Sequence, residues 1–379
     1  MAWTGDKSSV IVVGGGVFGA SIAGALAERG WAVQIVERYS PGHERSTSHD
    51  ASRLLRMSHG DEDLPDHWYT RSAQRSRELW LEIGQEESVD IFVPCGALWL
   101  ARSENGFESQ SAEDLAALQI PAERLDPDEA ADFFPDIRHD DLNFLLYEPL
   151  AGILRATACV SALISRAIRH GAVLRTGRAS RDRDGIALDG ETLTADRVIW
   201  ACGPWLPALF PRLVNLRSIK QSVFYFAVQS QWTTPPLPAW LDDGADSYGH
   251  GDLDGGGFKA VHAPPGGGPE LDPDDLERLH EPAALDRTRG VLGHRFPALA
   301  SAPLVAARVC QYELTPDRHF IVAPTDDTCR EWIVGGGSGH GFKHGPSLGH
   351  YVADLLESRE RPRAAFALGR QATLGVDHE

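Results

Sequence analysis

Residues 9–38 constrain the fold most, because two apolar runs flank a glycine-rich turn. Residues 10–13 are apolar throughout, which predicts a buried strand. The turn at 14–19 reads G-x-G-x-x-G, and the periodic segment after it predicts an amphipathic helix. A second apolar strand at 32–36 ends at Glu37. This β-α-β order within about thirty residues is the context in which the glycine pattern indicates a dinucleotide site.

Each glycine of the turn has its own physical role. Gly14 permits the tight turn, Gly16 lets a pyrophosphate approach the backbone, and Gly19 lets helix and strand pack closely. The helix N-terminus offers free N–H groups to phosphates. Glu37 is placed to accept a hydrogen bond from a ribose hydroxyl. The alternative is a glycine turn used only for packing, and the pattern does not distinguish NAD from FAD.

Composition limits the class of protein and its partners. The 379 residues allow one large interleaved fold or two domains, and the net charge of 36 − 54 = −18 argues against nucleic acid and anionic membranes as partners. A polar N-terminus and the lack of long apolar runs predict a cytoplasmic protein. The five scattered cysteines suit a reduced protein. No cluster of His and Cys has metal-ligand spacing, so we expect no metal.

Two arginines follow the first β-α-β unit. Arg53 and Arg56 are one helical turn apart if this segment is helical, so both guanidinium groups can point the same way. The planar guanidinium binds anions in bidentate fashion, which makes both side chains candidates for holding a carboxylate. Two surface arginines are the alternative, and the spacing alone does not decide between them.

The rest of the chain alternates predicted helices and strands. Residues 91–93 and 97–100 are expected to pair around the turn at 94–96, and we expect the glycine-rich segment 249–257 to set the size of a pocket. Helices are expected at 66–85, 156–170 and 347–357, and further strands at 172–175, 185–188, 193–195, 198–202, 221–228, 258–262, 309–312, 320–322 and 332–334.

Three stretches together carry a family resemblance. Residues 1–57, the run C-Q-Y-E-L-T-P-D-R-H-F at 310–320 and S-G-H-G-F-K at 338–343 resemble the monomeric sarcosine oxidase branch of the D-amino-acid-oxidase-like flavoproteins. That branch includes N-methyltryptophan, pipecolate and fructosyl amino acid oxidases. The resemblance implies an α/β fold with α+β elements, in which a Rossmann-like FAD-binding domain is interleaved with a mostly antiparallel-sheet substrate domain. The FAD-binding domain is expected at 1–85, 151–218 and 303–379, and the substrate domain at 86–150 and 219–302.

The resemblance further implies that FAD is the cofactor. Cys310 matches the position that forms a thioether to the flavin 8α-methyl group, and His49 and Arg53 match positions that contact the flavin and assist that step. For Cys310 the alternative is a buried core cysteine. The cofactor contacts that we expect are Gly14, Gly16, Val17, Phe18, Gly19, Glu37, Arg38, Ser46, Thr47, His49, Arg53, Ala179, Gly203, Trp205, Cys310, Gly337, Gly339, His340, Gly341, Phe342 and Lys343.

The resemblance also implies a substrate site. Arg56 and Lys343 match the cationic pair that holds a substrate carboxylate, and Tyr248 and Tyr312 match substrate contacts. Lys259 matches a lysine that meets the flavin through water and promotes the reaction of reduced flavin with oxygen. Catalytic roles are thus expected for Lys259, Arg53, His49 and Tyr312.

One departure from the family pattern lies on the substrate side, where His59 stands in place of a tyrosine. We expect an FAD-dependent oxidase that converts the C–N bond of a carboxylate-bearing primary or secondary amine to an imine and reduces O₂ to H₂O₂. A flavin-dependent dehydrogenase or biosynthetic tailoring enzyme acting on a larger amine or a carrier-bound amino acid is one alternative, and a non-catalytic flavin-binding subunit is another. A monomer is compatible with the resemblance, although the sequence determines neither the oligomeric state nor the substrate.

Overall fold

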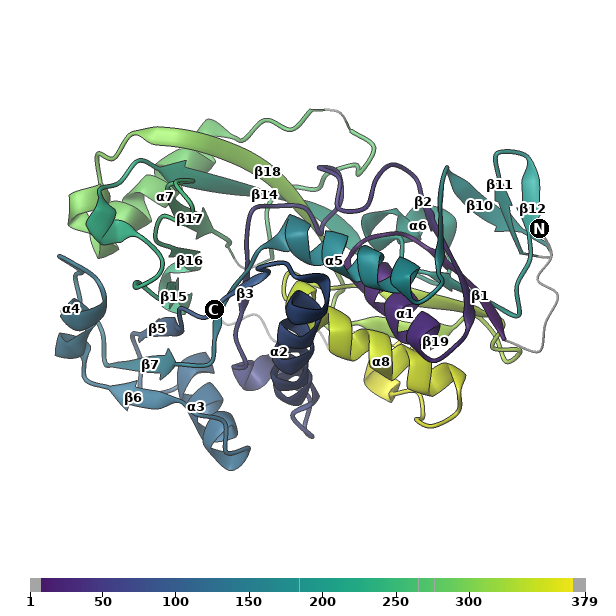
Figure 1. Ribbon diagram of the computed structural model, residues 1–379. Coiled ribbons are helices and arrows are strands. Elements are labelled where there is room, and N and C mark those ends of the chain that lie inside the picture. Colours follow the sequence, from purple (N-terminus) through teal and green to yellow (C-terminus); the bar gives the residue numbers. More distant parts are fainter. Residues whose placement is uncertain (1–7, 184, 265, 276, 371–379) are drawn as a thin grey trace.

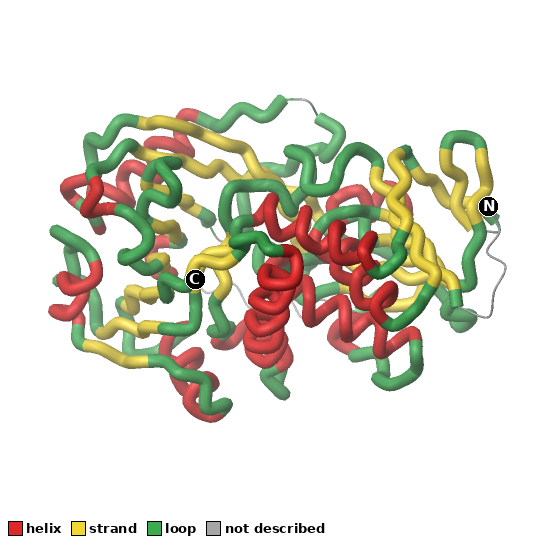
Figure 2. Tube along the Cα trace, viewed as in Figure 1, coloured by secondary structure: helices red, strands yellow, loops and turns green. Residues whose placement is uncertain are grey.

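The computed structural model describes residues 8–370 apart from 184, 265 and 276 (Figure 1). Within these residues the strands form two large sheets and two small ones, and most of the helices lie beside the first large sheet (Figure 2). The helices are α1 (Val17–Glu28), α2 (Trp68–Glu87), α3 (Phe107–Ala117), α4 (Ala130–Phe133), α5 (Ala156–Arg169), α6 (Leu206–Leu209), α7 (Pro282–Arg295) and α8 (Gly345–Leu356).

The first large sheet contains the N-terminal strand and is mostly parallel. Its order is β19-β20-β13-β1-β2-β9, and only β19 runs antiparallel to its neighbour. The apolar side chains of β1 are buried on both faces, as expected for an inner strand of a parallel sheet. The bounds are β1 (Ser9–Val13), β2 (Ala32–Glu37), β9 (Val173–Thr176), β13 (Arg197–Trp200), β19 (Ile321–Pro324) and β20 (Glu331–Gly335).

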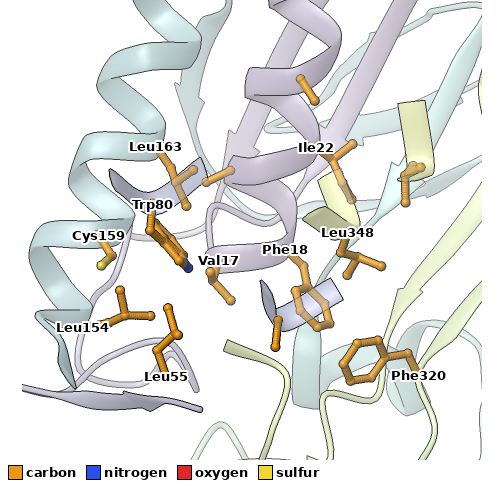
Figure 3. Packing of buried hydrophobic residues seen from close by; sticks show 14 of the residues in the cluster. Val17, Phe18, Ile22, Leu55, Trp80, Leu154, Cys159, Leu163, Phe320 and Leu348 are labelled. Atoms are coloured by element: carbon orange, nitrogen blue, oxygen red, sulfur yellow. The ribbon is translucent and has the colours of Figure 1, made fainter. Parts of the chain in front are cut away.

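Helix α1 is almost fully buried because α5 and α8 pack against it. Figure 3 shows Val17 and Ile22 of α1 near Leu163 of α5 and Leu348 of α8. Each fully buried side chain of this size contributes about 1.5–3 kcal/mol. A side chain at Gly349 would place its Cβ 2.5 Å from the Ser21 carbonyl oxygen, so this glycine allows α8 to approach α1 closely.

The second large sheet is mostly antiparallel, which confirms the fold class. Its order is β18-β14-β17-β16-β15-β5-β7-β6, with one parallel pair, β5 and β15. The long strands β14 and β18 extend from this sheet toward α6 and β2 (Figure 1). The bounds are β5 (Ala97–Ala101), β6 (Glu123–Leu125), β7 (Phe144–Glu148), β14 (Arg217–Phe226), β15 (Ala239–Asp242), β16 (Ser247–His250), β17 (Phe258–His262) and β18 (Leu304–Leu314).

The two small sheets have the orders β10-β11-β12 and β3-β8-β4. The first projects beyond the parallel sheet (Figure 1). Their bounds are β3 (Arg53–Leu55), β4 (Phe92–Val93), β8 (Gly152–Leu154), β10 (Ala179–Asp182), β11 (Gly185–Leu188) and β12 (Glu191–Leu193).

The predicted pairing of 91–93 with 97–100 is wrong. Both runs are strands, but β4 pairs with β8, whereas β5 pairs with β7 and β15. Gly96 between them has a φ of 77°, and a Cβ there would lie 2.6 Å from the ring of Tyr147. Gly96 therefore allows the chain to run close to β7 as it enters another sheet, and it does not close a hairpin.

The other predicted helices and strands have counterparts close to their expected positions. The residue-by-residue division into domains remains a prediction. Strand β18 lies in the segment expected to bind FAD and pairs with β14, so the antiparallel sheet contains residues from both expected domains. Residues 1–7 and 371–379 lie outside the described part. No helix in the described part is both long and apolar enough to cross a bilayer, and none of the five cysteines, all of them described, forms a disulfide.

Candidate functional site

A cavity of 1280 Å³ is lined by residues from both large sheets. We call the part lined by Gly14, Gly16 and Glu37 the glycine-turn region, and the part lined by Arg56, Trp99, Phe107, Asp243 and Tyr248 the arginine region. The predicted site residues that line the cavity are Gly14, Gly16, Val17, Phe18, Glu37, Arg38, Ser46, Thr47, Arg53, Arg56, Ala179, Gly203, Trp205, Tyr248, Cys310, Tyr312, Gly337, Gly339, His340, Gly341 and Phe342. The predicted residues outside the lining, all of them described, are Gly19, His49, Lys259 and Lys343.

The glycine-turn region is shaped by close backbone contacts. Gly14 has a φ of 110°, and a Cβ there would lie 2.3 Å from the Ala201 carbonyl oxygen. A Cβ at Gly19 would lie 1.9 Å from the Gly14 carbonyl oxygen, so Gly19 serves helix–strand packing and not the cavity wall. Gly16 lines the cavity without such a clash, because its nearest neighbour would be Ser48 Oγ at 3.1 Å. The backbone thus leaves a shallow cradle where the sequence predicts a pyrophosphate.

Carboxylates at the rim of this region are held in fixed orientations. Glu37 Oε2 accepts a 2.6 Å hydrogen bond from the Gly15 N–H. Asp274, which the sequence did not single out, accepts hydrogen bonds from Arg38 at 2.6 Å and from Trp205 Nε1 at 2.9 Å. These contacts bring the expected cofactor residues Arg38 and Trp205 together at the cavity wall.

Glu313 supplies a buried acceptor that sequence reasoning missed. Its Oε1 accepts a 3.2 Å hydrogen bond from the Gly337 N–H, while its buried Oε2 has no hydrogen-bond partner among the described residues. Burial raises the pKa of this carboxyl group, which lines the cavity near Thr47. A hydroxylated chain such as that of a flavin nucleotide fits here, since its hydroxyls can pair with the unsatisfied oxygen. The residues present therefore fit FAD.

Asp50 is a third residue that the sequence did not single out, and it holds two predicted side chains. Its Oδ2 accepts hydrogen bonds from Arg53 at 2.9 Å and from Lys259 Nζ at 2.8 Å, and its Oδ1 accepts one from Tyr225 at 3.1 Å. Burial alone would raise the pKa of Asp50, but Lys259 and Arg53 hold it below its usual value. Lys259 also donates a hydrogen bond to Ser52 Oγ at 2.9 Å. Its positive charge is therefore paired with Asp50 and is not presented to the cavity.

Cys310 lies on β18 and lines the cavity beside this ion-pair cluster. Burial and the Asp50 carboxylate raise the pKa of the thiol, whereas Arg53 and Lys259 oppose that shift. His49 does not line the cavity, because its Nδ1 pairs with the Gly42 carbonyl oxygen at 2.8 Å. Its own carbonyl oxygen accepts a 2.7 Å hydrogen bond from Arg53, so its contact with the cluster is through the backbone.

The condition for aligning Arg53 with Arg56 on one helical face is not met, because residues 53–55 form β3. This strand pairs with β8, so tertiary hydrogen bonds determine the conformation of the segment. Both arginines nevertheless line the cavity. The Arg56 guanidinium lies over the ring of Trp99 at 4.9 Å and over that of Phe107 at 5.3 Å, and it donates to the Ser58 carbonyl oxygen. Both arginines therefore reach the cavity without a helix.

Acidic side chains share the arginine region with Arg56. The cavity is also lined here by Asp61, Glu62, Asp243 and Asp246. Glu62 pairs with Arg318 at 2.8 Å. Burial and the charge of Glu62 raise the pKa of Asp243. This part of the cavity therefore suits a ligand that carries charges of both signs.

Lys343 is buried near this region, in the single turn Phe342–His344 before α8. Burial lowers the pKa of its amine, and the charge of Arg56 lowers it further, so the two cations act on one another. The Lys343 carbonyl oxygen accepts a 3.0 Å hydrogen bond from Trp80 Nε1, which fixes the backbone of the turn.

The expectation that residues 249–257 set the pocket size is wrong, since none of these described residues lines the cavity. A Cβ at Gly251 would lie 2.4 Å from the Trp232 carbonyl oxygen, so this glycine serves close backbone packing. Pro264, Gly266 and Gly267 of the next loop line the cavity in its place.

The sequence model for "DAO: FAD dependent oxidoreductase" matches residues 9–355. Monomeric sarcosine oxidase of Streptomyces avermitilis is 30% identical over 364 residues, which cover 91% of this chain and 92% of that protein. N-methyl-L-tryptophan oxidase of Salmonella enteritidis is 25% identical over 389 residues, which cover 98% and 97%.

The fold is also similar to that of a solved structure, L-proline dehydrogenase from P. horikoshii. The TM-score is 0.81 with 21% sequence identity, and the match covers 96% of each chain. The family match spans most of the chain, and the residues of the cavity fit the cofactor that its description states. The chain therefore belongs to the FAD-dependent oxidoreductase family and is an oxidoreductase of the sarcosine and N-methyl amino acid oxidase type.

Proposed function

We propose that this protein oxidises the C–N bond of a carboxylate-bearing primary or secondary amine to an imine and passes the electrons to O₂. The substrate loses two electrons and two protons, and O₂ takes them up to give H₂O₂. Bound FAD supplies the two-electron acceptor between these half-reactions. The observation that carries the proposal is that one cavity joins the glycine-turn region to a half-buried arginine on aromatic rings.

In this proposal Arg56 binds the substrate carboxylate, with Lys343 as the second cation. The Trp99 and Phe107 rings restrict the Arg56 guanidinium, so less side-chain entropy is lost when the anion binds. Tyr248 and Tyr312 complete the substrate contacts from β16 and β18. Fixing the carboxylate orients the C–N bond, and the main contribution of these residues is proximity.

On the cofactor side, we propose that FAD lies along the glycine-turn region and is bound covalently by Cys310. The position of the thiol in the cavity wall, beside Arg53 and close to Lys259, supports this assignment, because both cations stabilise a thiolate. His49 is proposed to assist through its carbonyl oxygen, which accepts a hydrogen bond from Arg53. The segments proposed to bind FAD are 1–85, 151–218 and 303–379, and those proposed for the substrate side are 86–150 and 219–302.

A dehydrogenase or tailoring enzyme is the second candidate, and one observation favours it. A free cation beside the flavin would stabilise negative charge that develops on oxygen, which is the role proposed for Lys259. Here the Lys259 ammonium is paired with Asp50 at 2.8 Å and does not line the cavity. Such pairing reduces the net positive charge that oxygen would meet.

Reduction and reoxidation of the purified flavoprotein test these functions separately. We expect N-methyl amino acids to bleach the flavin anaerobically, and we expect O₂ to restore its absorbance with release of one H₂O₂ per flavin. Rapid bleaching with slow reoxidation by O₂ but rapid reoxidation by an artificial acceptor would select the dehydrogenase. No bleaching by any amine or amino acid would select the non-catalytic flavin subunit.

Acid precipitation tests the attachment of the cofactor. Flavin absorbance should remain in the precipitated wild-type protein and appear in the supernatant of Cys310→Ser. Cys202→Ser is the matched control, since Cys202 also lines the cavity and its thiol is buried. Flavin that is released from the wild-type protein would disprove covalent attachment and leave the FAD fold unaffected.

A further inference from the structure

Three histidines from distant parts of the chain meet behind the arginine region of the cavity. His59 follows β3, His340 lies in the loop after β20, and His344 ends the turn before α8. One ring nitrogen of each lies within 4.8 Å of those of the other two. His59 and His344 are buried, and His340 lines the cavity. His340 is one of the expected cofactor contacts, but the proposed oxidation of amines gives no role to His59 or His344.

The outward-facing ring nitrogens are all engaged. His59 Nδ1 pairs with the Met57 carbonyl oxygen at 2.8 Å, and His340 Nε2 pairs with the Arg318 carbonyl oxygen at 3.1 Å. A carbonyl oxygen only accepts, so both of these nitrogens carry the proton, and the other nitrogen of each ring bears a lone pair. Histidine ligands of metals have this arrangement, in which the second N–H donates to a carbonyl or carboxylate.

His344 can adopt the same state. Its Nδ1 lies 3.1 Å from Ser72 Oγ and its Nε2 lies 3.2 Å from His59 Nε2. A hydroxyl can donate or accept, so a proton on His344 Nδ1 can be donated to Ser72 and leaves Nε2 free. His340 Nδ1 is buried and has no hydrogen-bond partner within the described ranges. With protons on His59 Nδ1, His340 Nε2 and His344 Nδ1, the other ring nitrogen of each histidine has a lone pair available for a metal ion.

The spacing is close to that of a metal site. Tetrahedral zinc with bonds of about 2.05 Å to nitrogen needs ligand nitrogens about 3.3 Å apart. The pair formed by His59 and His344 already has 3.2 Å, and His340 lies on a loop with positive φ at Ser338 and Gly339. A small movement of that loop would bring the third nitrogen to bonding distance. Because His340 lines the cavity, an ion can reach the site from solvent through it.

We propose that His59, His340 and His344 form a binding site for a divalent transition-metal ion that prefers imidazole ligands, such as Zn²⁺ or Cu²⁺. The ion enters through the cavity, and its fourth position is taken by water. Aromatic rings fix the imidazoles, since His59 stacks on Tyr69 and His340 stacks on Phe320 at centroid distances of 5.6 and 5.0 Å.

Charge limits the affinity of this site. Burial lowers the pKa of all three histidines, and the charge of Lys343 lowers each further. The same charge and that of Arg56 repel a cation, although Glu62 and Glu148 lie near enough to compensate in part. We therefore expect micromolar and not nanomolar binding.

Copper and zinc binding to the EDTA-treated flavoprotein test this site. Wild type should bind one Zn²⁺ per chain by calorimetry, and the Cu²⁺ complex should show electron paramagnetic resonance splitting from three nitrogens. His344→Gln and His59→Gln should each weaken zinc binding at least thirtyfold, and Ser72→Ala about tenfold. His319→Gln is the matched control, because His319 also stacks on Tyr69 but is not one of the three.

Flavin absorbance and thermal melting verify that each variant is folded. If His59→Gln or His344→Gln does not fold, His340→Gln replaces them, since its side chain lies in the loop and lines the cavity. A wild-type protein that binds no metal, or whose copper signal lacks coupling to three nitrogens, would overturn the proposal. Binding that is unchanged in the histidine variants would overturn it as well, because surface histidines would then account for the ion. None of these readouts depends on the oxidase activity.

Discussion

A ligand in the glycine-turn region faces backbone, whereas a ligand in the arginine region faces side chains. Gly14 and Gly16 come from one short segment, and the former is held by a close contact to Ala201. Arg56 and Phe107 approach the arginine region from separate elements. A substitution that shifts the backbone of one short segment disturbs the whole glycine-turn region. In the arginine region, by contrast, single side chains can be replaced one at a time. The two regions should therefore respond differently to substitution.

The largest effect is expected from Gly19→Ala in the glycine-turn region. The new Cβ would lie 1.9 Å from the Gly14 carbonyl oxygen, so the turn itself must move. We expect a loss of about 5 kcal/mol in the free energy of unfolding, and protein purified without FAD. Denaturant unfolding and the flavin absorbance of the purified protein measure both effects.

Gly24→Ala in the same helix is the control. Its Cβ would have only the Leu163 carbonyl oxygen at 4.0 Å nearby, and alanine favours a helix over glycine by about 0.5–1 kcal/mol. We expect this variant to keep FAD and to be slightly more stable. Equal effects at the two glycines would show that the close contact at Gly19 does not decide cofactor binding.

The second effect concerns Asp50, which lies between the two regions. Asp50→Asn leaves the buried Lys259 and the half-buried Arg53 without their counter-charge, so we expect a loss of about 3 kcal/mol in unfolding free energy. The pKa of Asp50 is lowered by folding, so its contribution is present above its unfolded value of 3.8 and is lost as the pH falls below it. Chemical denaturation of wild type and variant at pH 7 and pH 3 should show a difference that shrinks at pH 3.

Arg308→Gln is the control for Asp50. Arg308 lies 3.6 Å from the same carboxylate, but its side chain is 44% exposed. Exposed ion pairs contribute about 0–1 kcal/mol, so this variant should unfold almost as wild type does. A loss of unfolding free energy as large as that of Asp50→Asn would mean that the stability of the cluster depends on its net charge and not on the buried ion pairs.

The third effect belongs to the arginine region. Arg56→Gln removes the proposed carboxylate contact, so we expect kcat/KM for an N-methyl amino acid to fall about 100-fold, or about 2.7 kcal/mol. For the corresponding amine without a carboxylate we expect less than a threefold change. Steady-state kinetics with this substrate pair measure the difference. An equal loss for both substrates would assign Arg56 to packing on Trp99 and not to anion binding.

The contrast between the regions also explains what the sequence could predict. The glycine pattern places a dinucleotide cradle because all of its parts lie within residues 9–38, and local sterics fix their geometry. The predicted pairing of β4 with β5 is wrong for the opposite reason. The partner of β4 is β8 and the partners of β5 are β7 and β15, all of which lie elsewhere in the sequence. Non-local hydrogen bonds of this kind leave no mark in the segments themselves.

The missed residues follow the same rule. Asp50 lies three residues before Arg53, which could have suggested an ion pair, but Lys259 and Tyr225 reach it from the antiparallel sheet. His340 and His344 are four residues apart, whereas His59 is far away in sequence, so only the fold brings the three rings together. The acceptor at Glu313 became recognisable only when the backbone placed Gly337 beside it.

The smallest effect is expected behind the arginine region, at Glu108. This carboxyl group is buried in the first turn of α3 next to Phe107, and burial raises its pKa to about 7. The unfolded chain therefore releases this proton more readily than the folded one, so the contribution of Glu108 to stability falls as the pH rises from about 4.5 to 7. Glu108→Gln has no proton to lose. We expect it to raise the unfolding free energy by about 1–2 kcal/mol at pH 8 and to change it little at pH 4, measured by denaturant unfolding. A gain of the same size at both pH values would show that glutamine improves packing and that Glu108 is ionised in the folded protein. The arginine region would then carry the negative charge of Glu108 in addition to the charges of Asp243 and Glu62.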